Sequence, residues 1–299
     1  MLSISKILKH FFVIILLSLP ILCFAAKTND ISTVDNQHSS VVYSASDSLI
    51  FIKVMDKLKN GEDRNLSGRL IDAANLLLGT PYLAHTLEQS PERLIINLRE
   101  TDCILFVETC LALSMCSLYE ESNFENFLEA VRTLRYRDGL IDGYCSRIHY
   151  TSEWFTQLEK LGLGREISKD VANTVVNQKF SFMSEHTSSY VQLSNNIENV
   201  EKIKQIERNL NRAMYYIIPK DGLKHYLGSL RTGDILGFST SIKGLDITHV
   251  AIIYVKENGE LSFIHASMKE NRVVIERKSL LEYVNSISSC NGIRVFRLK

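Results

Sequence analysis

One cysteine stands where a catalytic nucleophile would be expected. Cys103 follows Asp102 at the start of an apolar stretch with helical spacing, so its thiol falls in the first turn of a predicted helix. The partial positive charge of a helix N-terminus stabilises a thiolate, and we expect it to lower the pKa of this thiol. The free N–H groups of that turn also suit an oxyanion. The alternative, a small buried core residue, stays open on this evidence alone.

Two histidines interrupt apolar strands in the C-terminal third of the chain and are candidates for the general base. His249 lies in the segment 247–254, and His265 lies in the segment 263–267. A cysteine nucleophile needs a base, and the base usually needs an orienting partner. Each histidine by itself is equally well explained as a hydrogen-bonded core residue.

The hairpin between these strands decides whether the two rings meet. A three-residue loop ending in Gly259 at positive φ would pair Lys256 with Glu260 and place His249 and His265 on one face as diagonal neighbours. A two-residue turn would place them on opposite faces. Glycine at the third loop position favours the first arrangement.

The remaining elements predict an α+β protein. Helical spacing covers Asp47 to Leu78 and begins again at Thr101, and a mostly polar, helical segment follows from Glu120 to Leu223. Alternating or apolar runs then predict an antiparallel sheet. These runs are residues 234–238, 247–255, 261–266, 272–275 and 292–298.

Composition and charge exclude some functions. The chain has 299 residues, of which 45% are hydrophobic, and this is ordinary for a globular protein. It carries 34 basic and 34 acidic residues, so its net charge offers no case for binding nucleic acid.

The N-terminus has the layout of a secretory signal peptide. Lys6 and Lys9 precede an apolar run over 11–22, and Ala25 and Ala26 follow it. We therefore predict a signal peptide over 1–25, a polar linker over 26–46, and an exported protein, periplasmic or secreted, with no stable membrane anchor after cleavage. The apolar run is shorter than the ~20 residues that span a bilayer.

Cysteine usage also suggests a reactive thiol. Five cysteines remain after the predicted cleavage, and an odd number leaves at least one outside any internal disulfide. A free thiol in an oxidising compartment is a liability unless it is used.

An ordered set of short segments resembles the NlpC-type cell-wall peptidases, which are papain-like cysteine hydrolases. The set is Gly79-Thr80-Pro81-Tyr82, Asp102-Cys103, Thr232-Gly233-Asp234-Ile235-Leu236, His249-Val250-Ala251-Ile252 and Phe263-Ile264-His265-Ala266-Ser267. The chain departs from that family in lacking a Ser-Gly pair after the cysteine and in its long interval from cysteine to histidine. Both departures resemble a narrower branch, the N-acetylmuramoyl-L-alanine amidase-like proteins first catalogued as a domain of unknown function.

Two further segments are similar to that branch. One is Asp102-Cys103 followed by Phe106-Val107-Glu108, and the other is the run from Arg147 to Trp154 that contains His149 and Tyr150.

The resemblance implies a fold and a set of roles. The fold would be a single papain-like catalytic domain over 47–299, with a helical insert over about 120–223 that borders the cleft. Cys103 would be the nucleophile, His249 the general base and acid, and His265 the residue that orients His249. The residues implied in substrate binding are Tyr82, Asp102, Arg147, Tyr150 and Trp154.

The implied substrate is peptidoglycan or a muropeptide, and the implied reaction is cleavage of the amide between N-acetylmuramic acid and L-alanine. No cofactor and no metal are implied, although a cysteine with two histidines can also mimic a zinc ligand set. Two alternatives stay open: an endopeptidase that cuts after D-glutamate in the stem peptide, and a peptidoglycan-binding protein of the same fold that does not hydrolyse.

Overall fold

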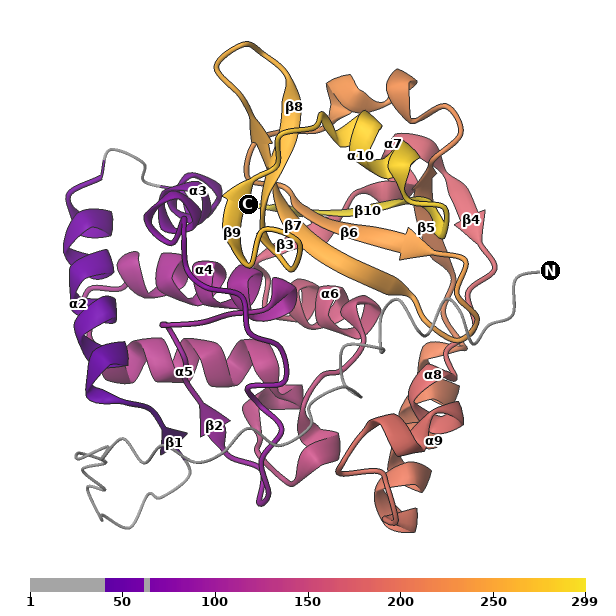
Figure 1. Ribbon diagram of the computed structural model, residues 1–299, viewed down its shortest axis with the longest axis horizontal. Helices are drawn as coiled ribbons and strands as arrows, with labels where there is room; N and C mark the ends of the chain where they lie inside the picture. The colour runs from indigo at the N-terminus through magenta and orange to yellow at the C-terminus, as the bar shows by residue number, and fades with distance from the viewer. Residues whose placement is uncertain (1–40, 62–64) are drawn as a thin grey trace, which may run out of the picture. The chain divides into compact units, whose positions relative to one another are not determined.

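The computed structural model describes residues 41–61 and 65–299 (Figure 1). The predicted signal peptide and most of the predicted linker lie outside these residues. Residues 41–46, which the sequence placed in the linker, form strand β1 (Val41–Val42) and the start of helix α2, where the Ser44 side chain accepts a hydrogen bond from the Asp47 N–H. Strand β1 pairs in parallel with β2 (Leu94–Ile95).

Four helices form the N-terminal part of the structure. They are α2 (Ala45–Lys59), α3 (Leu66–Leu76), α4 (Cys103–Ser117) and α5 (Phe124–Arg135). Helix α4 is apolar on all sides and is therefore buried on all sides, with Val107, Cys110 and Leu111 fully covered. It contacts α2, α3 and α5 and also strand β7, so it joins the helices to the sheet.

The helical spacing predicted over Asp47 to Leu78 is confirmed by two helices, with a break that the spacing did not indicate. The structure has two helices, α2 and α3, and the chain leaves helical geometry after Asn60. A new helix begins at Asn65, whose side chain accepts a hydrogen bond from the Gly68 N–H at 2.8 Å. Asparagine and glycine favour helix ends over helix interiors, and this outweighs the continuous apolar spacing.

The C-terminal part is an antiparallel sheet, as predicted. Its strands lie in the order β4-β5-β10-β6-β7-β8-β9, and β3 pairs with β10. All five predicted runs are strands: β6 (Ile235–Thr240), β7 (Ile247–Val255), β8 (Leu261–Ser267), β9 (Arg272–Ile275) and β10 (Cys290–Leu298).

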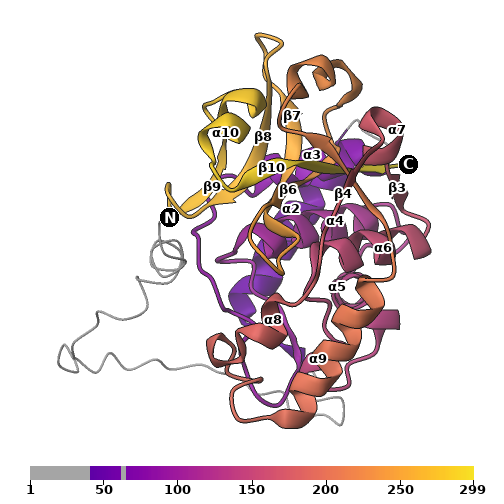
Figure 2. The same cartoon turned by 90° about the vertical axis from the view of Figure 1, so that its right-hand side faces the viewer.

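The segment over 120–223 is only partly helical, which corrects the prediction of a helical insert. Three short strands of this segment extend the sheet: β3 (Gly164–Glu166), β4 (Thr174–Val176) and β5 (Tyr215–Pro219). Its other helices are α6 (Thr151–Lys160), α7 (Ser168–Ala172), α8 (Phe182–Glu185) and α9 (Ile197–Leu210). Figure 2 shows α8 and α9 side by side.

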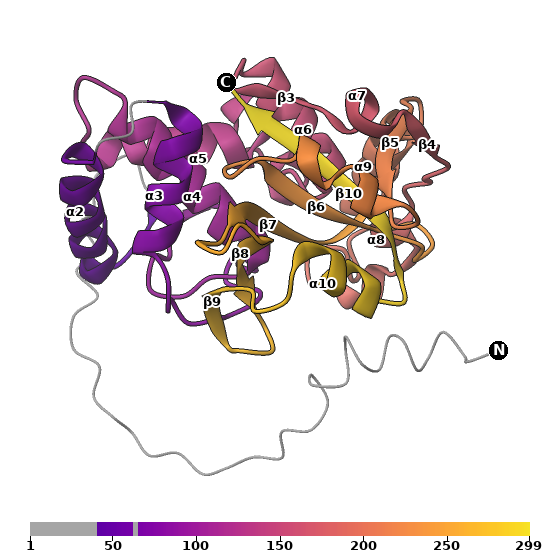
Figure 3. The same cartoon turned by 90° about the horizontal axis from the view of Figure 1, so that it is seen from above.

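The two faces of the sheet are covered by different elements. Along β7, Val250 and Ile252 belong to the core shared with α4, whereas Ala251 and Ile253 belong to a second core. Helix α10 (Leu280–Ser286) contributes to that second core and packs beside β8 (Figure 3). Within the described part of the chain, no helix is long and apolar enough to cross a membrane.

Candidate active site

The hairpin between β7 and β8 has the predicted register. Ile252 pairs with Ile264, the Lys256 N–H donates to the Glu260 carbonyl at 2.9 Å, and Gly259 has a φ of 81°. The loop therefore has three residues, with glycine in the left-handed conformation that this turn requires. The predicted arrangement of the strands is confirmed.

This register brings the two histidines into direct contact. His249 Nε2 lies 2.7 Å from His265 Nδ1, and the rings meet edge to face. Both lie on the face of the sheet that α10 covers, beside the rings of Phe238, Phe263 and Tyr283. Because Nε2 of His249 is engaged by His265, Nδ1 is the ring nitrogen left to serve as a base.

Cys103 is the first residue of α4, as predicted. Asp102 caps the helix, and its Oδ1 accepts a hydrogen bond from the Leu105 N–H at 2.9 Å. The Cys103 side chain is half-buried. The backbone N–H groups of Cys103, Ile104 and Val250 all favour its thiolate, which places the sulfur beside the residue that follows His249 in β7.

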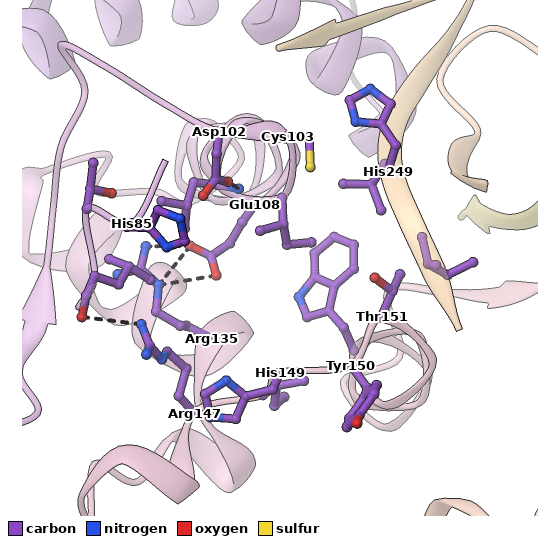
Figure 4. Close-up of a pocket in the computed structure, with 18 of the residues that line it drawn as sticks. His85, Asp102, Cys103, Glu108, Arg135, Arg147, His149, Tyr150, Thr151 and His249 are labelled. Carbon is purple, nitrogen blue, oxygen red and sulfur yellow. Dashed lines mark hydrogen bonds and ion pairs between the residues drawn. The ribbon is translucent and has the colours of Figure 1, made fainter. Parts of the chain in front are cut away.

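A cavity of about 290 Å³ opens beside these residues (Figure 4). Cys103 and His249 both line it, Cys103 from the N-terminus of α4 and His249 from the start of β7. Residues 147–151 and Trp154 form another wall, so part of the segment over 120–223 borders the cavity as expected.

The pKa of the Cys103 thiol contradicts the sequence expectation. Burial, helped by the Asp102 carboxylate, raises it to about 12, and the nearby N–H groups oppose this change without outweighing it. Burial lowers the pKa of His249 to about 3, helped by His265, and burial lowers that of His265 to about 4. The cysteine and both histidines are therefore neutral at ordinary pH.

The other predicted binding residues occupy different positions. Asp102, Arg147, Tyr150 and Trp154 line the cavity, whereas Tyr82 does not. Tyr82 pairs with Thr101, the residue before Asp102, in an isolated β-bridge, and burial raises its pKa.

Two of these side chains are already engaged within the protein. Arg147 pairs with Glu88 at 3.0 Å, and the Tyr150 hydroxyl donates to Glu207 at 2.7 Å. The indole N–H of Trp154 is buried and has no acceptor among the described residues. Arg147 Nε is likewise buried without a hydrogen-bond partner among the described residues, 3.6 Å from Glu92. The roles of these residues in substrate binding stay predictions.

Several cavity residues were not assigned a site role from the sequence. Arg135 and Glu108 form a buried ion pair at 2.5 Å, and Arg135 also donates to the Ile95 carbonyl. His149 donates through Nε2 to the Tyr144 carbonyl at 3.0 Å, and burial lowers its pKa well below the usual range. Glu108 and His149 stand within the family-like segments, but Arg135 carries no local signal.

We expect Glu108→Ala to destabilise the fold by about 3–5 kcal/mol, because it leaves the Arg135 guanidinium buried and unpaired. Urea unfolding followed by circular dichroism measures this. The matched control is Glu129→Ala, which removes an exposed partner of Arg132 and should change stability by no more than about 0.5 kcal/mol. Equal effects of the two substitutions would refute a structural role for the buried pair.

The cysteines of the described residues form no disulfide. Cys103, Cys110, Cys116, Cys145 and Cys290 are all free. Over 41–61 and 65–299, no group of three His, Cys, Asp or Glu residues is arranged to hold a metal ion.

Fold and site together define a class: an α+β protein in which a cysteine at a helix N-terminus shares a cavity with one member of a histidine pair on an antiparallel sheet. The chain belongs to the N-acetylmuramoyl-L-alanine amidase-like (AmiA-like) family, which matches residues 72–293. The family assignment made from the short segments is confirmed.

Solved structures agree with this assignment. An N-acetylmuramoyl-L-alanine amidase from Bacteroides uniformis ATCC 8492 is 33% identical with a TM-score of 0.74, covering 78% of this chain and 99% of its own. A putative xylanase from Bacteroides fragilis is 36% identical with a TM-score of 0.72, covering 76% and 99%. A Legionella pneumophila protein at 19% identity and a TM-score of 0.63, covering 85% and 94%, shares the fold. The comparison with curated proteins found no match.

Proposed function

We propose that this protein is a cysteine-dependent N-acetylmuramoyl-L-alanine amidase of papain-like fold, with Cys103, His249 and His265 as its catalytic triad. The observation that carries the proposal is the 2.7 Å contact between the two histidines, together with the cavity that His249 shares with Cys103. Family membership supports peptidoglycan as the substrate.

The reaction begins when Cys103 attacks the lactyl carbonyl of N-acetylmuramic acid. The thiol proton passes to Nδ1 of His249 as the S–C bond forms, and N–H groups at the start of α4 stabilise the oxyanion. His249 then gives this proton to the leaving amine of L-alanine, and the C–N bond breaks. Water, deprotonated by His249, hydrolyses the remaining thioester and frees the thiol.

The neutral state of Cys103 and His249 affects the first step. Because burial raises the pKa of Cys103 to about 12 and lowers that of His249 to about 3, a thiolate–imidazolium pair is disfavoured before substrate binds. Proton transfer therefore accompanies the attack on the carbonyl and does not precede it. His265 assists by holding the His249 ring in place.

A glycosidase activity, suggested by the name of the Bacteroides fragilis relative, finds less support. Glycoside hydrolysis usually needs two available carboxyl groups on either side of the sugar bond. The three carboxylates that line the described cavity are engaged: Glu88 with Arg147, Asp102 with the Leu105 N–H, and Glu108 with Arg135.

The molecular masses of the products identify the bond that is cleaved. A purified disaccharide-peptide is expected to give free disaccharide and the intact stem peptide, because Cys103 attacks the carbonyl that joins them. Mass spectrometry after complete digestion measures this, with heat-inactivated protein as control. If the sugar instead keeps L-alanine and D-glutamate, the enzyme is an endopeptidase.

We also propose that the protein is exported to the periplasm or secreted. Support comes from the basic, apolar and small-residue pattern at its N-terminus. Export would bring the protein to the compartment that contains peptidoglycan.

A further inference from the structure

The geometry points to Glu276 as a positioning residue that extends the histidine pair into a line of three groups, His249, His265 and Glu276. The inference rests on the proposed function of His249 as the base. Glu276 follows β9, and its Oε2 lies 3.5 Å from Nε2 of His265. No sequence motif marked this glutamate.

The contact involves Nε2 of His265, a buried ring nitrogen that needs a hydrogen-bond partner. His265 is 2% exposed, and its Nε2 has no hydrogen-bond partner among the described residues. A buried ring nitrogen of this kind normally has a partner. The Glu276 carboxylate can accept this hydrogen bond. A small side-chain movement would shorten the 3.5 Å between Oε2 and Nε2 to hydrogen-bonding distance.

The negative charge of Glu276 selects one tautomer of each ring. Only one proton lies between His249 Nε2 and His265 Nδ1. If His249 donates it, His249 Nδ1 is free to accept the thiol proton and His265 carries its other proton on Nε2, facing Glu276. If His265 donates it, His249 Nδ1 is protonated and cannot act as a base. His265 Nε2 would then turn a lone pair toward a carboxylate, which is unfavourable.

The same charge acts during the reaction. When His249 takes the thiol proton, the pair of rings becomes positive in a buried site, where water cannot stabilise it. A carboxylate at the far end of the line lowers the energy of this state without touching substrate. Glu276 should therefore affect kcat and leave KM almost unchanged.

A backbone hydrogen bond holds the Glu276 carboxylate in position. Its Oε1 accepts a hydrogen bond from the Lys278 backbone N–H at 3.0 Å, which leaves Oε2 for His265. From α10, Tyr283 faces the same group, and its pKa is raised to about 12, first by burial and then by the charge of Glu276. Arg277 and Lys278 line the same open cavity of about 720 Å³ as Glu276 and Tyr283, so two cationic side chains share this opening with the carboxylate.

The test compares Glu276→Gln and Glu276→Leu with the wild type. The glutamine keeps the shape but loses the charge, and the leucine loses both. Because charge-assisted hydrogen bonds correspond to roughly a 10- to 100-fold effect, we expect kcat to fall about tenfold for glutamine and about a hundredfold for leucine. KM should stay within about twofold of the wild type. The control is Glu260→Gln, which removes a carboxylate that pairs with Lys256 at the β7–β8 turn and should leave kcat unchanged.

A second readout needs no substrate. Nitrogen-15 NMR of histidine-labelled protein, with His265 assigned by comparison with His265→Asn, should show its proton on Nε2 in the wild type. The Nδ1-protonated form should grow in Glu276→Leu and to a lesser degree in Glu276→Gln. Thermal melting checks that each variant is folded, and if the leucine variant is not, the glutamine variant decides alone.

The outcomes separate this inference from the proposed function. An unchanged kcat and an unchanged His265 tautomer in the folded Glu276 variants would overturn the inference, whatever the role of Cys103. If the tautomer shifts but Cys103→Ala still hydrolyses muropeptides, Glu276 positions the histidines and the proposed cysteine mechanism fails.

Discussion

With Cys103 replaced by alanine, hydrolysis of a disaccharide-peptide is expected to fall by roughly four orders of magnitude or more. The nucleophile is lost, and the oxyanion site and His249 that remain cannot form the thioester. The fold should persist because the side chain is small and only half-buried. Product formation followed by mass spectrometry, with circular dichroism as the check on folding, measures this.

The matched control is Cys110→Ala, on the same helix. Cys110 is fully buried in the core, so its replacement should lower stability and leave kcat unchanged. Turnover of Cys103→Ala close to that of the wild type would rule out a cysteine nucleophile. A loss of turnover in both variants, with both folded, would point to the helix as a whole.

The arrangement of the catalytic candidates was accessible from the sequence because it depends on short-range patterns. The apolar spacing after Asp102 placed Cys103 at a helix start, and Gly259 placed both histidines on one face of a hairpin. Each of these inferences uses residues within one element or one turn. The five C-terminal strands were found for the same reason, since their apolar runs are long enough to show a period.

The features that were missed depend on contacts between distant segments. Strands β3 and β4 have three residues each, too few for a period, and they form because β10 and β5 offer free edges. The partner of Glu108 lies 27 residues away in another helix. The pKa of Cys103 was predicted to fall because the helix N-terminus is visible in the sequence, whereas the burial that raises it is not.

The second large effect is expected for His249→Gln. Removal of the general base should lower kcat by about two to four orders of magnitude, because in the proposed mechanism His249 both takes the thiol proton and returns it to the leaving amine. Steady-state kinetics on the disaccharide-peptide measures this. The control is His225→Gln, a change at an exposed histidine, which should have no effect on kcat.

The same substitution should reduce the loss of unfolding free energy that the protein undergoes as the pH becomes acidic. Burial lowers the pKa of His249 from 6.5 to about 3, so below pH 6.5 the unfolded chain binds a proton that the folded protein excludes until about pH 3. Stability is therefore lost as pH falls through this window, by about 1.4 kcal/mol per pH unit for one such group, or about 2 kcal/mol at pH 5. His249→Gln removes this loss, so its unfolding free energy should drop less than that of the wild type between pH 7 and pH 5. Urea unfolding at the two pH values decides, and an equal drop in both proteins would show that His249 is not held neutral by burial.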